Sequence, residues 1–390
     1  MNSHERKELR YQRRQQKRTQ KRQKFLQSLP SYEEVFTFQN LYNAFWACRK
    51  EVSWKPSIQI YQHNITTEIT KMLNQLHSEQ GFRSDGFIEF NICERGKMRH
   101  IRSVNIKERV VQRCFCDNYL VPLLTHNLIY DNGASLRHKG VTFSLNRMKK
   151  HLQKYYKKHK TNQGYILLFD FSNYFGSISH EILYQQFDPL MLDEKCRKLF
   201  HHLVDVFGDV GLGLGSQVSQ VSAVAFLNKM DHFFENQSCV DGYARYMDDG
   251  YVIVQNLQAA QECKEKLFEF AKQLGVSLNE HKIKIIKLTK TFTFLKKRFL
   301  LTPIGKVVVR LNYKNVFKHR KRIKKLYCLT EKGVLTITDL QLSHLSWKGQ
   351  VIKRYNSRKA VYDIDKQIRR LLNGSNSNHA SYKCSISKGQ

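Results

Sequence analysis

The stretch at residues 243–254 constrains the fold of this chain more than any other segment. Apolar and aromatic residues lie on both sides of the triplet Asp248-Asp249-Gly250. An Asp-Gly pair between two apolar runs predicts a tight β-hairpin turn, because glycine adopts positive φ angles at little cost. The two acids are then either ordinary turn residues or a pair of carboxylates that repel each other and need a cation nearby.

A further acidic residue ends a second apolar strand. Residues 165–170 predict a short buried strand that stops at Asp170. If the two strands are neighbours, three carboxylates converge. Such a set suits two divalent ions about 3.5–4 Å apart, the arrangement that activates a 3′-hydroxyl and stabilises the leaving pyrophosphate in nucleotidyl transfer. Mg²⁺ is the expected ion, with Mn²⁺ as a substitute, because its ligands would be carboxylate, water and phosphate oxygens.

The charge of the chain indicates its partner. The 390 residues include 66 Lys and Arg but only 33 Asp and Glu, which gives a formal net charge of +33. A charge this large repels itself in the folded state unless a polyanion neutralises it. It is typical of a nucleic-acid-binding protein and argues against a small-molecule enzyme or an acidic signalling module.

The nine cysteines and the apolar runs bear on the compartment. No CxxC pair or Cys/His spacing of a zinc site occurs, so buried, reduced thiols are expected. The basic N-terminus lacks the apolar core of a signal peptide. No run of about 18 apolar residues exists to span a membrane. These features predict a cytoplasmic protein with no membrane partner.

The order of the predicted elements indicates an α+β sheet layered on helices. Residues 1–24 carry ten Lys and Arg, which predicts either a disordered arm or a solvated helix. Basic arms of this kind often hold nucleic acid, and the alternative is a merely solubilising tail. The chain turns basic and helical after residue 312. Helices are expected at 39–49, 106–124, 179–186 (capped by Ser179), 219–234 and 259–274, and strands at 86–92, 97–102, 165–170, 243–254 and 291–300, with a flexible turn at 211–215.

Five motifs in a fixed order over residues 80–300 resemble those of reverse transcriptases. The sequence Tyr246-Met-Asp-Asp resembles the family signature, and Phe169-Asp-Phe-Ser-Asn-Tyr-Phe-Gly-Ser-Ile resembles its first catalytic motif. The Gly-rich turn at 211–220, the segment 274–282 and Phe292-Thr-Phe-Leu follow in family order. One such motif alone would be weak evidence, whereas five in order with family spacing are very specific. The resemblance extends to the bacterial reverse transcriptases.

The resemblance implies a right-hand polymerase fold, with fingers, a palm whose antiparallel sheet lies on helices, and a helical thumb. The activity it implies is RNA-templated DNA synthesis by an RNA-directed DNA polymerase, a nucleotidyltransferase. The expected boundaries are 1–30 for the basic arm, 31–165 for the fingers, 166–305 for the palm with the rest of the fingers, 306–372 for the thumb and 373–390 for a disordered tail.

The resemblance also assigns roles to residues of the central region. Asp170, Asp248 and Asp249 would be the metal carboxylates, and the Phe171 carbonyl would be a further oxygen ligand. Phe175 stands where the family has an aromatic steric gate against the ribose 2′-hydroxyl, the alternative being ordinary core packing. Lys282 stands at the basic position that can protonate the leaving pyrophosphate, the alternative being a solvated lysine.

A second group of residues would contact the nucleotide. Lys97 and Arg99, followed by Arg109, resemble the fingers motif that meets the incoming triphosphate, with Arg137 behind them. The Gly-rich motif would act on the templating side through Leu214, Gly215 and Gln220. It departs from the usual family pattern, in which a glutamine stands at position 214 and a proline at position 220.

The altered motif resembles that of diversity-generating retroelements, so the predicted role is copying a cognate RNA in such an element or in another bacterial or prophage retroelement. One alternative is an antiviral-defence enzyme that makes DNA from a non-coding RNA or without a template. Another is a non-catalytic RNA-binding protein similar to intron maturases. The expected partners are the RNA template, the DNA product, the RNA–DNA heteroduplex and dNTPs, with a small accessory protein or a non-coding RNA as a further partner.

Overall fold

The computed structural model describes residues 3–84, 86–94, 97–352 and 356–374, which form two compact units. The first unit contains residues 1–151 and 165–285, and the second contains 152–164 and 286–390. Most of the predicted tail and the tip of the turn after Glu94 lie outside the described residues. Within the described ranges, no helix is both long and apolar enough to cross a membrane.

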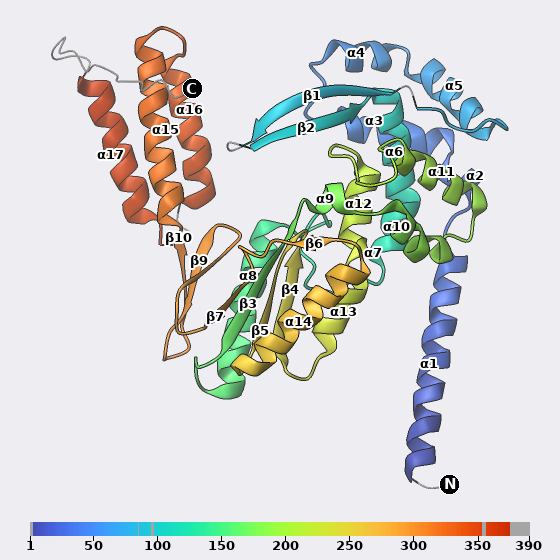
Figure 1. Cartoon of the computed structure of the whole chain (residues 1–390). Coiled ribbons are helices and arrows are strands. Elements are labelled where there is room, and N and C mark those ends of the chain that lie inside the picture. The colour runs from blue at the N-terminus through green and yellow to red at the C-terminus, as the bar shows by residue number, and fades with distance from the viewer. Residues whose placement is uncertain (1–2, 85, 95–96, 353–355, 375–390) are drawn as a thin grey trace. The chain divides into compact units, whose positions relative to one another are not determined.

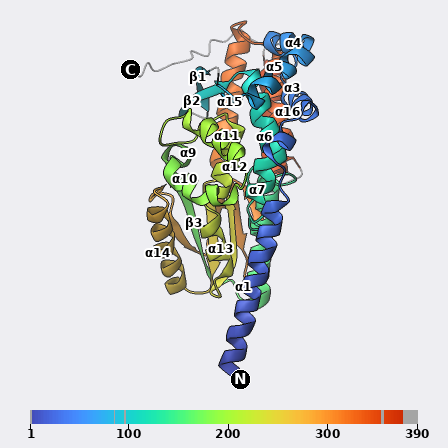
Figure 2. The same cartoon turned by 90° about the vertical axis from the view of Figure 1, so that its right-hand side faces the viewer.

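The first unit is built mainly of helices around one hydrophobic core (Figure 1). Its basic N-terminal segment forms the long helix α1, whose N-terminal part extends away from the other elements of this unit (Figures 1 and 2). The helices are α1 (Ser3–Gln27), α2 (Tyr32–Val35), α3 (Phe38–Arg49), α4 (Pro56–His63), α5 (Ile65–His77), α6 (Ile106–Phe115), α7 (Val121–Thr125), α8 (Val141–His159, which continues into the second unit), α9 (Tyr174–Ser177), α10 (His180–Phe187), α11 (Glu194–Asp205), α12 (Gln217–Phe226), α13 (Asn228–Asn236) and α14 (Leu257–Gln273).

The central sheet of the first unit has the strand order β4–β5–β3–β6. Its strands are β3 (Tyr165–Ser172), β4 (Val240–Tyr246), β5 (Asp249–Val254) and β6 (Ser277–Leu278). All of these neighbours pair antiparallel, and α13 and α14 pack against the sheet (Figure 1). A separate antiparallel ribbon joins β1 (Phe87–Glu94) to β2 (Lys97–Val104). The predicted α+β class is confirmed.

Two predicted helices are interrupted. A π-helical turn at Cys116–Leu120 separates α6 from α7. Pro122 follows it and has no N–H to donate to the carbonyl of Asn118, which accounts for the break. The predicted helix at 219–234 is two helices, α12 and α13, because the backbone of Leu227 leaves the helical range with ψ near 10°.

Smaller predictions also need correction. Ser179 is at the N-cap of α10, but its side chain makes no capping hydrogen bond. The eight cysteines of the described residues are free thiols as expected, yet only four are buried, and Cys93 and Cys239 are exposed.

The second unit combines a sheet with three helices. Its strands β8 (Phe292–Phe294), β9 (Lys297–Leu301) and β10 (Val307–Leu311) pair antiparallel in the order β10–β9–β8. The preceding strand β7 (Lys284–Lys287) pairs instead with β3 of the central sheet. The helices α15 (Tyr313–Glu331), α16 (Ile337–Val351) and α17 (Arg358–Gly374) share a small apolar core. The predicted helical region after residue 312 is therefore observed.

A polar network lies beside this small core. His319 Nε2 is 3.2 Å from His344 Nδ1, and His344 Nε2 is 2.7 Å from Asp365 Oδ1. The Lys348 ammonium donates to the other oxygen of Asp365 at 2.8 Å. The His319 ring stacks on Trp347 with centroids 4.3 Å apart. Both histidines are buried, so the three helices are joined by hydrogen bonds as well as by apolar contacts.

Candidate active site

The antiparallel pairing of β3 with β5 brings two carboxylates together. Asp170 lies directly opposite Asp249 in the register of the two strands. Asp170 is only 5% exposed, and Asp249 is partly buried. The third acid, Asp248, is in the turn between β4 and β5, and its main-chain carbonyl accepts a hydrogen bond from the Phe171 amide at 3.3 Å. Segments 78 residues apart in the sequence thus supply one cluster of acids.

The hairpin turn differs from the one that the Asp-Gly pair predicts. Tyr246 pairs with Asp249, so the turn residues are Met247 and Asp248, and Met247 has a left-handed φ of 58°. Gly250 is inside β5 instead. A Cβ atom at Gly250 would lie 2.1 Å from Cζ of Phe169. The glycine is therefore required by the close approach of an aromatic ring, and not by a positive φ angle.

A buried ion pair stabilises the main chain of this turn. Arg245 and Asp231 have no exposed surface, and the guanidinium contacts both carboxylate oxygens at 2.6 and 2.8 Å. Tyr243 donates a further hydrogen bond to Asp231 at 2.7 Å. The Arg245 Nη1 atom donates to the Met247 carbonyl at 2.8 Å. Because a guanidinium presents its donors in a rigid fork, Arg245 links helix α13 to the main chain of the turn.

The electrostatics of the acid cluster favour a cation. Burial raises the pKa of Asp249 to about 8, helped by its hydrogen bond with Asp170 and by the charges of Asp170 and Asp248. Lys282 Nζ donates to Asp170 Oδ1 at 2.6 Å. Burial alone would lower the pKa of Lys282, but the hydrogen bond and charge of Asp170, with the other two acids, outweigh it and raise that pKa. The cluster thus needs positive charge, and Lys282 supplies part of it.

The donor set fits a hard divalent cation. Asp170 and Asp249 face each other, and the interaction with Asp170 helps to raise the pKa of Asp249, so this carboxylate pair would be stabilised by a cation. Carboxylate oxygens are the ligands that Mg²⁺ prefers. Among the described residues, no three His, Cys, Asp or Glu side chains are gathered closely enough to form a complete metal cage. The chain therefore offers a carboxylate pair with a third acid on the adjacent turn.

Three aromatic residues lie at the end of β3 and on α9, where the chain leaves the sheet. Phe171 is buried, and its ring packs on Tyr174 with centroids 5.5 Å apart. Asn173 has a left-handed φ of 44°, which turns the chain into α9. Phe175 on α9 is only partly buried, and its ring meets Tyr174 edge-on at 6.0 Å. Phe175 therefore keeps part of its ring accessible, unlike the core aromatics around it.

The Gly-rich segment contacts two other elements. Gly215 has a φ of 113°, and a Cβ there would lie 3.3 Å from the Arg102 carbonyl of β2. Gln112 of α6, which is 1% exposed, accepts a hydrogen bond from the Ser216 hydroxyl at 3.1 Å. Leu214 is partly buried, whereas Gln220 is exposed and donates to the Ser135 hydroxyl at 2.9 Å.

The family comparison decides the assignment. A family model described as reverse transcriptase (RNA-dependent DNA polymerase) matches residues 89–296, more than half of the chain. The chain belongs to the reverse transcriptase family. This result confirms the family prediction and, with the observed sheet and helices, the right-hand polymerase fold. The residue roles and the domain boundaries stay predictions.

Two telomerase structures are among the solved structures to which the chain shows a distant likeness. The apo telomerase from Candida tropicalis truncated from its C-terminal domain has a TM-score of 0.47 at 14% identity, over 64% of this chain and 60% of that one. The telomerase from Candida albicans in complex with the TWJ fragment of telomeric RNA has a TM-score of 0.47 at 12% identity, over 82% of this chain and 64% of that one. The chain thus spans less than two thirds of either structure. No curated protein matches it.

The remaining predicted residues of this reverse transcriptase lie on the β1–β2 ribbon, on α6 and on a loop. Lys97 and Arg99 belong to β2, and their side chains lie outside the described residues. Arg109 on α6 donates to the Ser103 hydroxyl at 3.0 Å. Arg137 is exposed on the loop between α7 and α8. The structure therefore brings Lys282 to the acids, and it shows no contact between Arg137 and that cluster.

Sequence reasoning missed the residues that support the site. Arg245 stands in a largely buried strand directly before the signature motif, and Asp231 is an acid beside the apolar residues Met230, Phe233 and Phe234 of α13. A charge in a buried run requires a buried partner, which was the available signal. No comparable signal marks Gln112, because its contact with Ser216 joins segments 104 residues apart.

Proposed function

We propose that this chain is an RNA-directed DNA polymerase that copies a cognate RNA into DNA with Mg²⁺. The observation that carries the proposal is the opposition of Asp170 and Asp249 across β3 and β5, beside a tight turn that presents Asp248. Membership of the reverse transcriptase family supports the reaction class. The net charge of +33 supports a nucleic-acid partner.

In the proposed mechanism, Asp170, Asp248 and Asp249 would hold the metal ions, and the Phe171 carbonyl would be a further ligand. Two bound Mg²⁺ ions, or Mn²⁺ in their place, would supply an activated 3′-oxygen and neutralise the developing charge of the pyrophosphate. Lys282 holds a proton, because its pKa is raised by Asp170 despite burial. This proton is available to the leaving pyrophosphate. Lys97, Arg99 and Arg137 would contact the triphosphate.

A substitution at the acid pair tests the activity. Asp249→Asn keeps the shape of the side chain but removes a carboxylate, so extension of a primer on an RNA template with labelled dNTP and Mg²⁺ should fall by several orders of magnitude. Glu265→Gln, on the exposed face of α14, is the matched control and should extend normally. Wild-type synthesis by Asp249→Asn would end the assignment.

The sugar specificity is tested at α9. The partly accessible ring of Phe175 supports a steric gate, because a ring under the incoming sugar clashes with a 2′-hydroxyl. Phe175→Ala should raise ribonucleotide incorporation relative to dNTP in mixed pools. The control Phe268→Ala removes an exposed ring from α14 and should leave the ratio unchanged. Altered fidelity without altered sugar choice in Phe175→Ala would contradict the gate.

The templating role of the Gly-rich motif is best tested at one position. Leu214→Gln adds one possible hydrogen bond, worth about 0.5–1.5 kcal/mol, so sequencing of the cDNA should show a several-fold drop in errors. Restoring proline at position 220 is a poorer test, because the Gln220 amide bonds to the Ser216 carbonyl at 3.2 Å in the first turn of α12. An unchanged error rate in Leu214→Gln would remove the motif from fidelity control.

The biological role that we propose is in a diversity-generating or related retroelement, with a small accessory protein or a non-coding RNA as a further partner. The altered motif at Leu214–Gln220 is the feature that supports it. We also propose the fingers, palm and thumb boundaries at 31–165, 166–305 and 306–372. Synthesis without any template would favour the antiviral-defence alternative. RNA binding with no synthesis by the wild type would favour a non-catalytic RNA-binding protein.

A further inference from the structure

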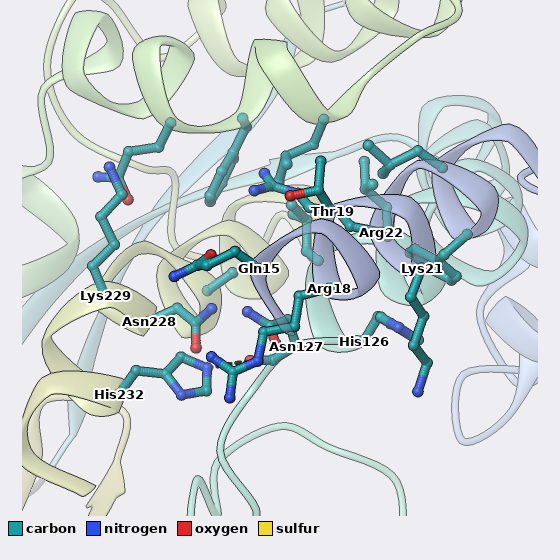
Figure 3. A pocket seen from close by; sticks show the side chains of 18 of the residues that line it. Gln15, Arg18, Thr19, Lys21, Arg22, His126, Asn127, Asn228, Lys229 and His232 are labelled. Carbon is teal, nitrogen blue, oxygen red and sulfur yellow. Dashed lines mark hydrogen bonds between the residues drawn. The ribbon is translucent and has the colours of Figure 1, made fainter. Parts of the chain in front are cut away.

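A groove with a volume of about 1150 Å³ lies between α1 and the helices of the first unit that it crosses. One wall is the C-terminal half of α1, and the opposite wall includes α13 and the end of α7. Figure 3 shows Gln15 and Arg18 of α1 extending toward Asn228 and His232 of α13. No predicted catalytic or nucleotide-binding residue lines this groove.

The charged side chains that line the groove are all basic. Arg18, Lys21 and Arg22 come from α1, and Lys229 comes from α13. No Asp or Glu is among its lining residues in the described part of the chain. Glu235, which is not a lining residue, lies 4.0 Å from the imidazole of His232. A concave surface with one sign of charge concentrates ligands of the opposite sign, so the expected ligand is a polyanion.

Two residues of the groove lining also carry unused hydrogen-bonding atoms just beneath its surface, which a ligand reaches once these side chains turn toward it. Asn228 Oδ1 and Gln186 Nε2 both belong to lining residues and are buried, and neither has a hydrogen-bond partner among the described residues. A buried polar atom without a partner costs free energy that a bound group can recover. One of these atoms accepts and the other donates. The ribose 2′-hydroxyl and the base edges of RNA offer both functions, whereas a bare phosphate chain only accepts.

Contacts at the C-terminal end of α1 fix the wall of the groove that this helix forms. The Phe25 ring stacks on His126 with centroids 3.7 Å apart, and Leu26 packs against the core of the first unit. His232 Nε2 bonds to the Asn127 carbonyl at 2.7 Å. The groove is therefore formed before a ligand binds.

The positive surface continues along α1. Arg14, Arg18 and Arg22 recur every four residues, so they lie on one face of the helix. Like charges at this spacing destabilise a helix, and a bound polyanion removes that repulsion. A membrane surface is not the expected ligand of α1. The only large apolar residues of this helix are Leu9, Tyr11, Phe25 and Leu26, too few for an apolar face that enters a membrane.

We propose that this groove binds a single strand of RNA, with its basic residues on the phosphates and with Asn228 and Gln186 on the sugar or base edges. The RNA is the enzyme's own template, which rests on the proposed function. The groove anchors this RNA at a site that is separate from the acid cluster. Its affinity does not depend on Mg²⁺ or on dNTP.

Binding of a fluorescein-labelled oligouridylate to the full chain, without Mg²⁺ and dNTP, tests the proposal. The variant Arg22→Gln/Lys229→Gln removes one charge from each wall. It should weaken binding about tenfold and lower the slope of log affinity against log salt by about 1.4, since each phosphate contact in a single strand contributes roughly 0.7. The control Arg197→Gln/Lys272→Gln removes the same charges from α11 and α14, away from the groove, and should change the slope much less.

A footprint gives a second measurement that does not depend on folding of a variant. Bound oligouridylate should protect Lys21 and Lys229 of the wild type from acetylation, and it should leave Lys272 reactive. Equal losses in the two double variants, or an unprotected Lys229, would overturn the proposal. So would polyglutamate that binds as tightly as the RNA and protects the same lysines, because the groove would then take an acidic polypeptide.

These outcomes are separate from those of the proposed function. If the wild type makes cDNA while the groove variant binds RNA as tightly as its control, the groove inference fails and the polymerase stands. If the groove variant loses binding but the wild type makes no cDNA on any template, the polymerase fails and the groove stands.

Discussion

A single methyl group at Gly250 should cost this protein both stability and activity. The residue pairs with Phe169 across β5 and β3, and a Cβ atom there would lie 2.1, 2.6 and 2.8 Å from three atoms of the Phe169 ring. Ordinary contact begins at about 3.4 Å. The ring is 2% exposed and is held between Phe171 and Tyr243, so it cannot retreat into solvent.

The variant Gly250→Ala should therefore destabilise the first unit by about 1–3 kcal/mol, the usual cost of overpacking a core. Its effect on catalysis should be larger. Gly250 directly follows Asp249, and Phe169 directly precedes Asp170, so strain relieved by separating β3 from β5 also separates the two acids. A misplacement of about 1 Å lowers a rate by roughly a hundredfold.

A double-mutant cycle measures this coupling. Urea unfolding and primer extension are compared for the wild type, Gly250→Ala, Phe169→Leu and the double variant. The smaller leucine side chain leaves room for the methyl group. The destabilisation of the double variant should therefore be smaller than the sum of the two single destabilisations by at least about 1 kcal/mol. Gly349→Ala is the control, because a Cβ there meets nothing within 4 Å. Additive effects, or a Gly250→Ala variant that behaves like Gly349→Ala, would refute the reasoning.

Three further perturbations test other features. Asp231→Asn leaves the buried Arg245 guanidinium without its counter-charge and should lower the free energy of unfolding by about 3–5 kcal/mol, and urea unfolding indistinguishable from wild type would contradict this role. The pKa of Asp249 is raised to about 8, so the metal-free folded state binds this proton more tightly than the unfolded state, and stability is lost as pH rises from about 4 toward 8. Without metal, the Tm of Asp249→Asn should therefore exceed the wild-type Tm by more at pH 8 than at pH 5. Addition of Mg²⁺ should raise only the wild-type Tm. Burial, with the charges of His344 and Arg322, lowers the pKa of His319 to about 4, so the unfolded state binds this proton more readily than the folded state. The stability of α15–α17 should therefore fall by up to about 3 kcal/mol as pH falls from 6.5 to 4. Hydrogen exchange in these helices checks this, and His319→Gln should make their stability less dependent on pH.

The sequence predicted the elements of the site because local patterns specify them. The apolar run that ends at Asp170 and the paired runs around Asp248 and Asp249 mark strands through their own residues. Family order then fixed the right-hand fold. The helix breaks were harder to predict, since periodicity continues through Pro122 and Leu227 while the backbone does not.

What the sequence could not predict depends on contacts between distant segments. The Asp-Gly pair indicated a turn centred on Gly250, but the register of β4 against β5 moves the turn to Met247 and Asp248. The need for glycine at position 250 arises from a ring on another strand, which no local pattern contains. The groove beside α1 likewise exists only because the helix forms and is held by the His126 stack.

The hydrogen bond from Arg245 to the turn has a consequence for how this site can change. The guanidinium holds a main-chain carbonyl at Met247, so it acts in the same way whatever side chain stands there. Substitutions at position 247 that tolerate a left-handed φ, such as asparagine or glycine, can alter the surface beside the acids without moving the acids themselves. The signature motif therefore contains one position whose main chain, and not its side chain, is what Arg245 uses to hold the turn.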